Sequence, residues 1–112
     1  MSQKIIIVLD CGATNVRSVA ISENGEILAQ KSYSNSTHSD PSFEDGIIWD
    51  VEEIWRKLKK ATKSILNEIP KEDIIGITTT SFGVDGAPFD KNGKQLYPVI
   101  SWACQRSNNI LA

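Results

Sequence analysis

Five consecutive apolar residues, Ile5 to Leu9, run directly into a short polar stretch near the start of the 112-residue chain. A continuous apolar run of this length is typical of a buried strand. The polar stretch, Asp10 to Asn15, contains a glycine, and a second β-like run follows from Val16 to Ile21. The chain is therefore predicted to begin with two strands joined by a tight turn.

The chemistry of this turn suits a nucleotide phosphate. Gly12 lets backbone N–H groups approach phosphate oxygens without a Cβ in the way, and Thr14 and Asn15 add short hydrogen-bonding side chains. Asp10 can hold Mg²⁺ through water, because Mg²⁺ keeps much of its hydration shell. The alternative is an ordinary β-hairpin turn, in which an acid and a glycine simply reverse the chain.

A mixed sheet is predicted from the order of the elements. Strands are expected at residues 4–9, 16–22, 26–34 and 74–80. Asn24-Gly25 between the second and third strands is a strong hairpin signal, because both residues tolerate positive φ. The order β-β-β-α-β is not that of a Rossmann domain, since two hairpins put antiparallel strands in the sheet. The predicted fold class is α/β.

The helix is the element with the strongest signal. Asp50 is a good N-cap, Glu53 completes a capping box, and Pro70 stops the helix. Its apolar residues recur at helical spacing: Val51, Ile54, Trp55, Leu58, Ala61, Ile65, Leu66 and Ile69. Trp55 is expected in the core and Trp49 against the start of the helix. The lysines fall mainly on the opposite face, which is predicted to be solvated.

The segment after the fourth strand is the second candidate site. Asp85, between Gly83 and Gly86, can supply acceptors for sugar hydroxyls, and ligands gather beyond the carboxyl ends of parallel strands. The alternative is a structural turn. Trp102 can pack on the apolar face of a sugar, although it can equally be a core aromatic, and Arg106 can bind hydroxyls or phosphate.

A long loop and a further hairpin are also predicted. Residues 35–47 are predicted to form a polar loop that is mobile or functional. A second hairpin is expected from residues 87–89 and 95–100, around the turn at 90–94.

Several motifs together resemble one family. They are Asp10-x-Gly12-x-Thr14-x-x-Arg17, Gly76-Ile77-Thr78, Ser81 to Ala87, Asp90 to Lys94, Tyr97 to Trp102, and a W-x-C-x-R ending at Arg106. Their order and spacing resemble the FGGY family of carbohydrate kinases, within the actin-like ATPase and sugar kinase superfamily. The resemblance covers essentially the whole chain and implies a ribonuclease-H-like domain, of which residues 1–112 are the first part.

The resemblance implies an ATP-dependent kinase of a ketose, L-fuculose first, with rhamnulose or xylulose as alternatives. It assigns the cofactors ATP and Mg²⁺ to Asp10, Gly12, Ala13, Thr14, Asn15 and Arg17, with Asp10 nearest the metal. It assigns the sugar to Gly83, Asp85, Trp102 and Arg106. The general base and the adenosine site are expected beyond residue 112, so the chain alone is expected to be inactive. A non-catalytic actin-like module that binds nucleotide or protein is the remaining alternative.

Composition limits the other possibilities. A net charge of −2 gives no electrostatic reason to expect nucleic acid or an anionic membrane as partner. No apolar run approaches the roughly 20 residues that span a bilayer. Two cysteines, Cys11 and Cys104, indicate neither a disulfide framework nor a zinc site, so a cytoplasmic location is expected. The oligomeric state cannot be inferred from the sequence.

Overall fold

The computed structural model describes residues 3–106 and residue 108. These residues form two compact units. Within the described residues, unit one comprises 3–35 and 53–82, and unit two comprises 36–52, 83–106 and 108.

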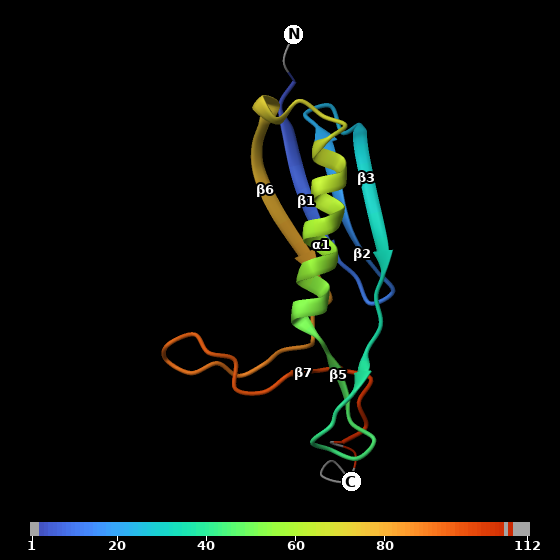
Figure 1. Ribbon diagram of the computed structural model, residues 1–112, viewed down its shortest axis with the longest axis vertical. Coiled ribbons are helices and arrows are strands. Elements are labelled where there is room, and N and C mark those ends of the chain that lie inside the picture. The colour runs from blue at the N-terminus through green and yellow to red at the C-terminus, as the bar shows by residue number, and fades with distance from the viewer. Residues whose placement is uncertain (1–2, 107, 109–112) are drawn as a thin grey trace. The chain divides into compact units, whose positions relative to one another are not determined.

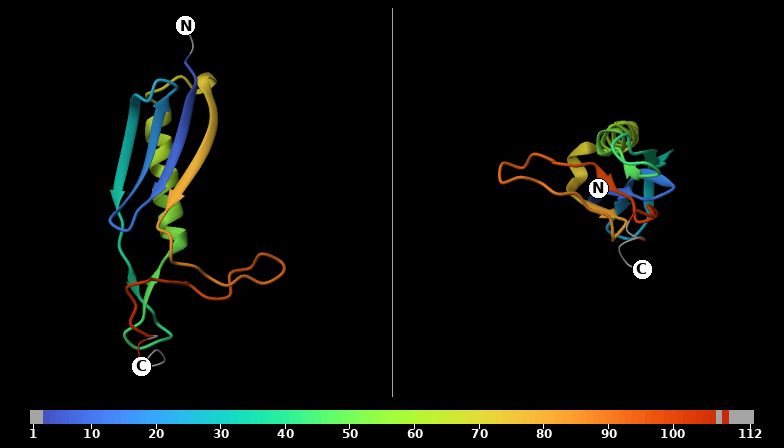
Figure 2. Two further views of the ribbon diagram at one scale, coloured as in Figure 1. Left: turned by 180° about the vertical axis from the view of Figure 1, so that it is seen from behind. Right: turned by 90° about the horizontal axis from the view of Figure 1, so that it is seen from below.

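Unit one is a four-stranded mixed sheet with a helix on one face (Figures 1 and 2). Its strands are β1 (Ile5–Cys11), β2 (Asn15–Ser22), β3 (Ile27–Ser34) and β6 (Ile74–Ser81), in the order β3-β2-β1-β6. Strand β1 is antiparallel to β2 and parallel to β6, and β2 is antiparallel to β3. The predicted β-β-β-α-β mixed sheet is confirmed.

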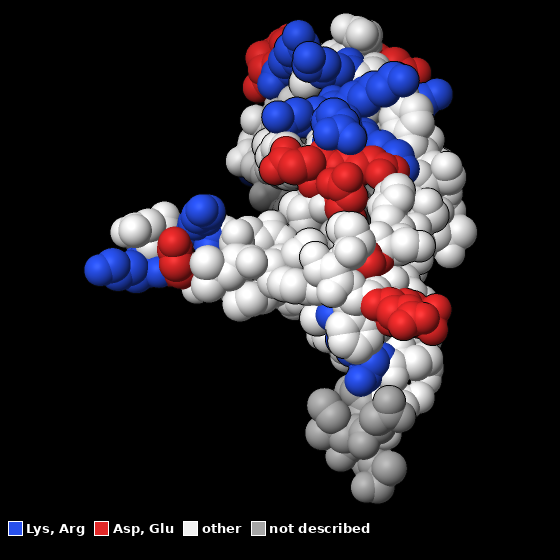
Figure 3. Space-filling view, turned by 60° about the horizontal axis from the view of Figure 1, so that its bottom comes forward, with Lys and Arg blue, Asp and Glu red and all other residues white. Residues whose placement is uncertain are grey.

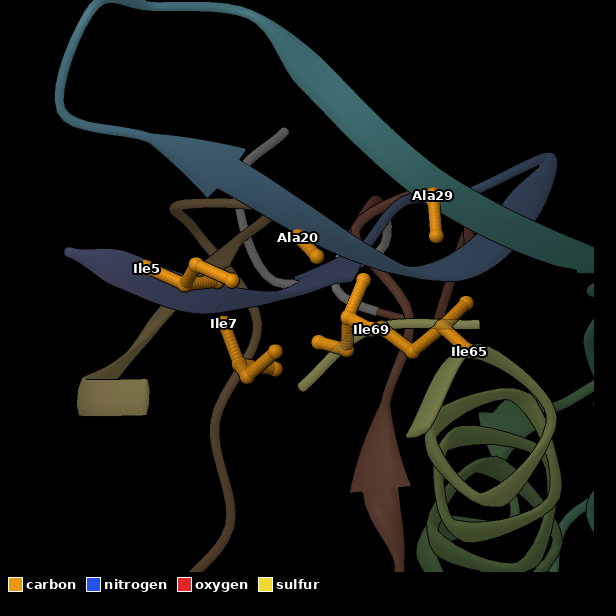
Figure 4. Close-up of a cluster of buried hydrophobic side chains, with 6 residues drawn as sticks. All are labelled: Ile5, Ile7, Ala20, Ala29, Ile65 and Ile69. Carbon is orange, nitrogen blue, oxygen red and sulfur yellow. The ribbon is translucent and has the colours of Figure 1, made fainter. Parts of the chain in front are cut away.

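The core of unit one lies between the sheet and the helix. Six buried side chains meet there: Ile5, Ile7, Ala20, Ala29, Ile65 and Ile69 (Figure 4). Side chains alternate between the two faces of a strand, so Ile5 and Ile7 are 0% and 1% exposed, whereas Ile6 between them is 42% exposed. The opposite face of the sheet is therefore the open one, and every second residue of β1 points to it.

Helix α1 spans Val51–Leu66 and begins directly after Asp50, as predicted. It ends before Pro70 is reached, although Ile69 is still buried in the core, and a short 3-10 helix, η1 (Lys71–Asp73), follows. No helix in the described ranges is long and apolar enough to cross a membrane.

The prediction that Trp55 lies in the core is wrong. The buried residues of α1 are Ile54, Leu58, Ala61 and Ile65. Their spacing defines a narrow stripe, and Trp55 lies beside it with 47% of its surface exposed. Trp55 instead lines a small apolar groove together with Leu9 and Ile77.

The lysines of α1 interact with side chains on and beside the helix. Lys57 Nζ lies 2.7 Å from Glu53 Oε1, one helical turn away, and Lys59 stands over the ring of Trp55. Lys60 stands over the ring of Tyr33 on β3. Figure 3 shows basic side chains gathered next to a band of acidic ones. Lys59, Lys60 and Lys63 are exposed, which agrees with the predicted solvated face, whereas Lys57 is half-buried and also donates to Ser34 O.

Glycine shapes both hairpin turns. Gly25 and Gly93 have φ of 83° and 82°, and Gly25 N–H donates to Ser22 O at 2.9 Å while Gly93 N–H donates to Asp90 O at 3.0 Å. Asp45 is the single non-glycine residue with positive φ in the described part of the chain. The hairpin predicted at Asn24-Gly25 is confirmed, and Gly25 rather than Asn24 is its left-handed residue.

Unit two contains a small antiparallel sheet of short strands. They are β4 (His38–Ser39), β5 (Ile47–Trp49) and β7 (Val99–Ile100), in the order β4-β5-β7. The predicted polar loop over 35–47 thus contains β4 and the start of β5. The predicted second hairpin is reduced to two isolated antiparallel bridges, Phe89 to Gln95 and Gly86 to Ile100, while Val99 and Ile100 also pair with β5.

Candidate active site

The turn between β1 and β2 is built around Gly12. Its N–H donates to Asn15 O at 2.9 Å, and a Cβ at this position would lie 2.8 Å from the same oxygen. Glycine is therefore required for closing the turn itself. The Gly12 N–H itself is used within the turn, and the expectation that the absent Cβ lets other backbone N–H groups approach a phosphate remains a prediction.

Asn35, the residue that follows β3, holds this turn through two hydrogen bonds. Its backbone N–H donates to Thr14 O at 2.8 Å, and its side-chain Nδ2 donates to Gly12 O at 2.9 Å. Asn35 is 8% exposed. Two hydrogen bonds from a buried residue restrict the turn to one conformation, which lowers the cost of ordering it around a ligand.

Asp10 and Arg17 form an ion pair across β1 and β2. They are register partners, and Arg17 Nε donates to Asp10 Oδ2 at 2.7 Å. Alternation along β1 places Asp10 on the open face of the sheet, and the two side chains are 28% and 46% exposed. The ion pair orients the carboxylate and leaves its second oxygen able to accept other donors.

Asp10 is an isolated acid in this region. Within residues 3–106 and 108, no three His, Cys, Asp or Glu side chains gather closely enough to hold a metal ion. A cation with its own shell of water needs only one or two carboxylates, as Mg²⁺ commonly does beside phosphates. The donor set therefore fits a hydrated cation rather than a fully protein-ligated one.

A groove of about 760 Å³ brings the predicted nucleotide-side residues together. It is lined by all six of them, Asp10, Gly12, Ala13, Thr14, Asn15 and Arg17, and also by Gln30, Lys31 and Ser32. Sequence reasoning missed the three residues on β3. The strand register could have found Ser32, since it lies directly opposite Arg17. That this groove binds a nucleotide remains a prediction.

The candidate sugar-side residues belong to unit two. Trp102 is 68% exposed, so it is not a core aromatic, and it lines a groove of about 520 Å³ with Arg106. Asp85 Oδ1 accepts the backbone N–H of Trp102 at 2.9 Å. Neither Gly83 nor Asp85 is among the residues that line this groove, and a Cβ on Gly83 would meet no atom within 4 Å.

Arg106 is held by partners within unit two. Its Nη2 lies 2.7 Å from Asp40 Oδ2, its Nε donates to Cys104 Sγ at 3.2 Å, and its guanidinium stands over the Phe43 ring. The hydrogen bond from Arg106 lowers the pKa of the Cys104 thiol. The guanidinium is thus oriented mainly by internal contacts, and its role towards a ligand remains a prediction.

Asp40 is the buried centre of this cluster, with a side chain that is 1% exposed. The Tyr97 hydroxyl donates to it at 2.5 Å, and this bond and the contact with Arg106 lower its pKa. A Cβ on Gly46 would lie 2.8 Å from Asp40 Cβ and 3.0 Å from Phe43 O, so the cluster also favours glycine there. Sequence reasoning missed Asp40 because it stands in a loop with no periodic signal.

Comparison with known proteins identifies the family. Residues 5–112 match the FGGY family of carbohydrate kinases, N-terminal domain. The chain belongs to this family. It is 49% identical to the L-fuculokinase of Haemophilus influenzae, covering 96% of this chain and 24% of that protein. It is 42% identical to the L-fuculokinase of Escherichia coli K12, covering 99% of this chain and 24% of that protein.

A solved kinase structure agrees with the fold. The gluconate kinase from Lactobacillus acidophilus superposes with a TM-score of 0.80 at 21% identity, over 98% of this chain and 22% of that one. This confirms the predicted actin-like ATPase fold. The chain spans about a quarter of the length of the two L-fuculokinases, at 24% of each.

Proposed function

We propose that this chain is the N-terminal part of an ATP-dependent ketose kinase that converts L-fuculose to L-fuculose 1-phosphate. The observation that carries the proposal is the 49% identity to an L-fuculokinase over almost the whole chain. A kinase for rhamnulose or xylulose is the closest alternative, and a non-catalytic actin-like module is the alternative from another class.

On the nucleotide side, the proposed binding residues are Asp10, Gly12, Ala13, Thr14, Asn15 and Arg17. The groove that they share offers hydroxyl, amide and cationic donors beside one carboxylate, which is the donor set that a metal-bound polyphosphate needs. Asp10 would hold hydrated Mg²⁺. Bound Mg²⁺ would neutralise charge on the phosphate oxygens.

On the sugar side, the proposed binding residues are Gly83, Asp85, Trp102 and Arg106. The exposed Trp102 ring offers an apolar face for the C–H groups of a sugar. A carboxylate has about four acceptor positions, and Asp85 accepts from Trp49 and from the Trp102 backbone. The remaining positions can accept sugar hydroxyls.

The general base that deprotonates the sugar hydroxyl is proposed to lie beyond residue 112. Asp10 does not take that role, because its carboxylate is paired with Arg17 beside the phosphate turn. Phosphoryl transfer depends on positioning and charge stabilisation. Residues 1–112 alone are therefore expected to contribute binding groups without catalysing transfer.

The test uses the complete protein encoded by the reading frame that contains this chain. Initial rates of ADP release are measured with MgATP and with L-fuculose, L-rhamnulose and D-xylulose in turn. The highest kcat/KM is expected for L-fuculose. A higher value for either other ketose would reassign the substrate within the family, and no ketose-dependent release from any of them would favour the non-catalytic module.

A further inference from the structure

The carboxylate of Asp85 connects three segments of unit two. Its Oδ2 accepts the indole Nε1–H of Trp49 at 2.6 Å, and its Oδ1 accepts the backbone N–H of Trp102 at 2.9 Å. Trp49 is the last residue of β5, and Trp102 follows β7. One carboxylate therefore links the end of one strand to the turn that follows its neighbour.

Trp102 projects from that turn. Cys104 N–H donates to Ser101 O at 2.9 Å, which closes a turn with Trp102 in its middle, and Ser101 is 3% exposed. A residue in the middle of a turn has no strand partner for its N–H. Asp85 supplies the acceptor, so the position of this carboxylate determines the backbone from which the exposed Trp102 ring extends.

Trp49, the residue that donates to Asp85 from the end of β5, is buried, with 4% of its surface exposed. A buried indole N–H needs an acceptor, and a hydrogen bond to a carboxylate is stronger than one between neutral groups. The bond also restricts the carboxylate, because Asp85 can rotate only by giving up one of its two donors. Trp49 is one of the residues that line a groove with His38 and Tyr97, but very little of its surface is exposed there.

We propose that Trp49 is a positioning residue of the sugar site, whose indole N–H orients Asp85 and, through Asp85, the Trp102 ring. This inference rests on the sugar-side roles proposed above for Asp85 and Trp102. The sequence alone predicted only that Trp49 packs against the start of α1, because its partner lies 36 residues away.

The first measurement compares two Trp-to-Phe variants of the complete protein. Trp49→Phe keeps an aromatic ring and removes the donor, and Trp55→Phe is the control on the exposed side of α1. Trp49→Phe is expected to raise KM for L-fuculose about tenfold, as loss of a hydrogen bond to a charged group does, and to change KM for ATP less than about twofold. Trp55→Phe is expected to change neither. If Trp49→Phe changed KM for L-fuculose and KM for ATP equally, Trp49 would be a packing residue and the proposal would be overturned.

The second measurement is a double-mutant cycle on kcat/KM for L-fuculose, with Trp49→Phe, Asp85→Asn and the double variant. If Trp49 acts through Asp85, Trp49→Phe has much less effect once Asp85 is already changed. Additive losses would show that the two residues act separately, which contradicts the proposal even when the unmodified protein is an active L-fuculose kinase. An inactive unmodified protein would instead refute the proposed function.

A third measurement does not depend on the folding of Trp49→Phe. In an isotope-labelled sample of the complete protein, Asp85→Asn is expected to shift the indole proton resonance of Trp49 upfield and to leave that of Trp55 in place. An unmoved Trp49 resonance would show that the hydrogen bond is absent in solution, and the inference would then fail.

Discussion

The position of Asp10 predicts that its substitution removes activity and leaves the protein folded. It lies on the open face of the sheet with its side chain 28% exposed, and its ion-pair partner is Arg17. Partly exposed ion pairs of this kind contribute at most about 1 kcal/mol to stability. Its position in the β1–β2 groove is the reason to expect a role with the metal and the phosphates.

We predict that Asp10→Asn lowers kcat of the complete protein about a hundredfold or more, because charge stabilisation at the transferring phosphoryl group is lost. Thermal melting is expected to stay close to that of the unmodified protein. Glu68→Gln, an exposed acid-to-amide change outside the groove, is the control and is expected to keep full activity. Near-normal turnover of a folded Asp10→Asn variant at limiting Mg²⁺ would show that the turn is an ordinary hairpin.

Asp40 makes the stability of the fold depend on pH in a definite direction. Its pKa in the folded protein is lowered by the Tyr97 hydroxyl and by Arg106. A group whose folded-state pKa is lowered stabilises the fold above its unfolded value, about 3.9 for Asp, and loses that contribution as the pH falls through the folded value.

We therefore predict that Asp40→Asn lowers the melting temperature at neutral pH, and that the difference from the unmodified protein narrows as the pH falls below about 4. Thermal melting at a series of pH values between neutral and acid measures this difference. The same Asp-to-Asn change at Asp90, in an exposed hairpin turn, is measured alongside for comparison. If the difference in melting temperature between Asp40→Asn and the unmodified protein stays constant across the pH series, the contacts of Asp40 with Tyr97 and Arg106 are contradicted.

The β2–β3 hairpin depends on a single left-handed residue. Gly25 has φ of 83°, and a Cβ there would meet no atom within 4 Å, so strain from the backbone conformation is the whole cost of substitution. We predict that Gly25→Ala destabilises the fold by about 1 kcal/mol and Gly25→Asn by less, because Asn tolerates the left-handed region better. Gly86→Ala, where φ is not positive and space is open, should leave the melting temperature unchanged. Equal melting temperatures for all three variants would show that the turn adopts another conformation.

The elements of unit one were predictable because each carries one long pattern. Ile5 to Leu9 is an unbroken apolar run, and the stripe from Ile54 to Ile65 has helical spacing. Trp55 was misplaced because spacing alone does not separate the centre of an apolar stripe from its edge. The strands of unit two are two or three residues long, too short for any period to appear.

The candidate site was predictable only where its residues are close in sequence. Asp10 to Arg17 form one hairpin, and the structure places them along one groove. Ser32 joins that groove through the pairing of β2 with β3, and it could be found only by extending the register of the predicted hairpin to Arg17. The bond between Trp49 and Asp85 spans 36 residues and left no local signal.

The residues that the structure describes hold two candidate binding grooves, one in each unit. The β1–β2 groove belongs to unit one, and the Trp102 groove belongs to unit two. The chain spans 24% of the length of its L-fuculokinase relatives. We expect binding groups from both grooves to need the rest of the protein, because phosphoryl transfer requires positioned groups in a site from which water is excluded.

The decisive experiment measures ADP release by the complete protein and by residues 1–112 alone, side by side, with saturating L-fuculose and MgATP. We predict sugar-dependent ADP release by the complete protein and a rate for residues 1–112 equal to that of a blank without protein. Release by residues 1–112 above the blank would contradict the placement of the general base beyond residue 112. No sugar-dependent release by the complete protein would contradict the proposal that this chain carries the binding groups of a ketose kinase.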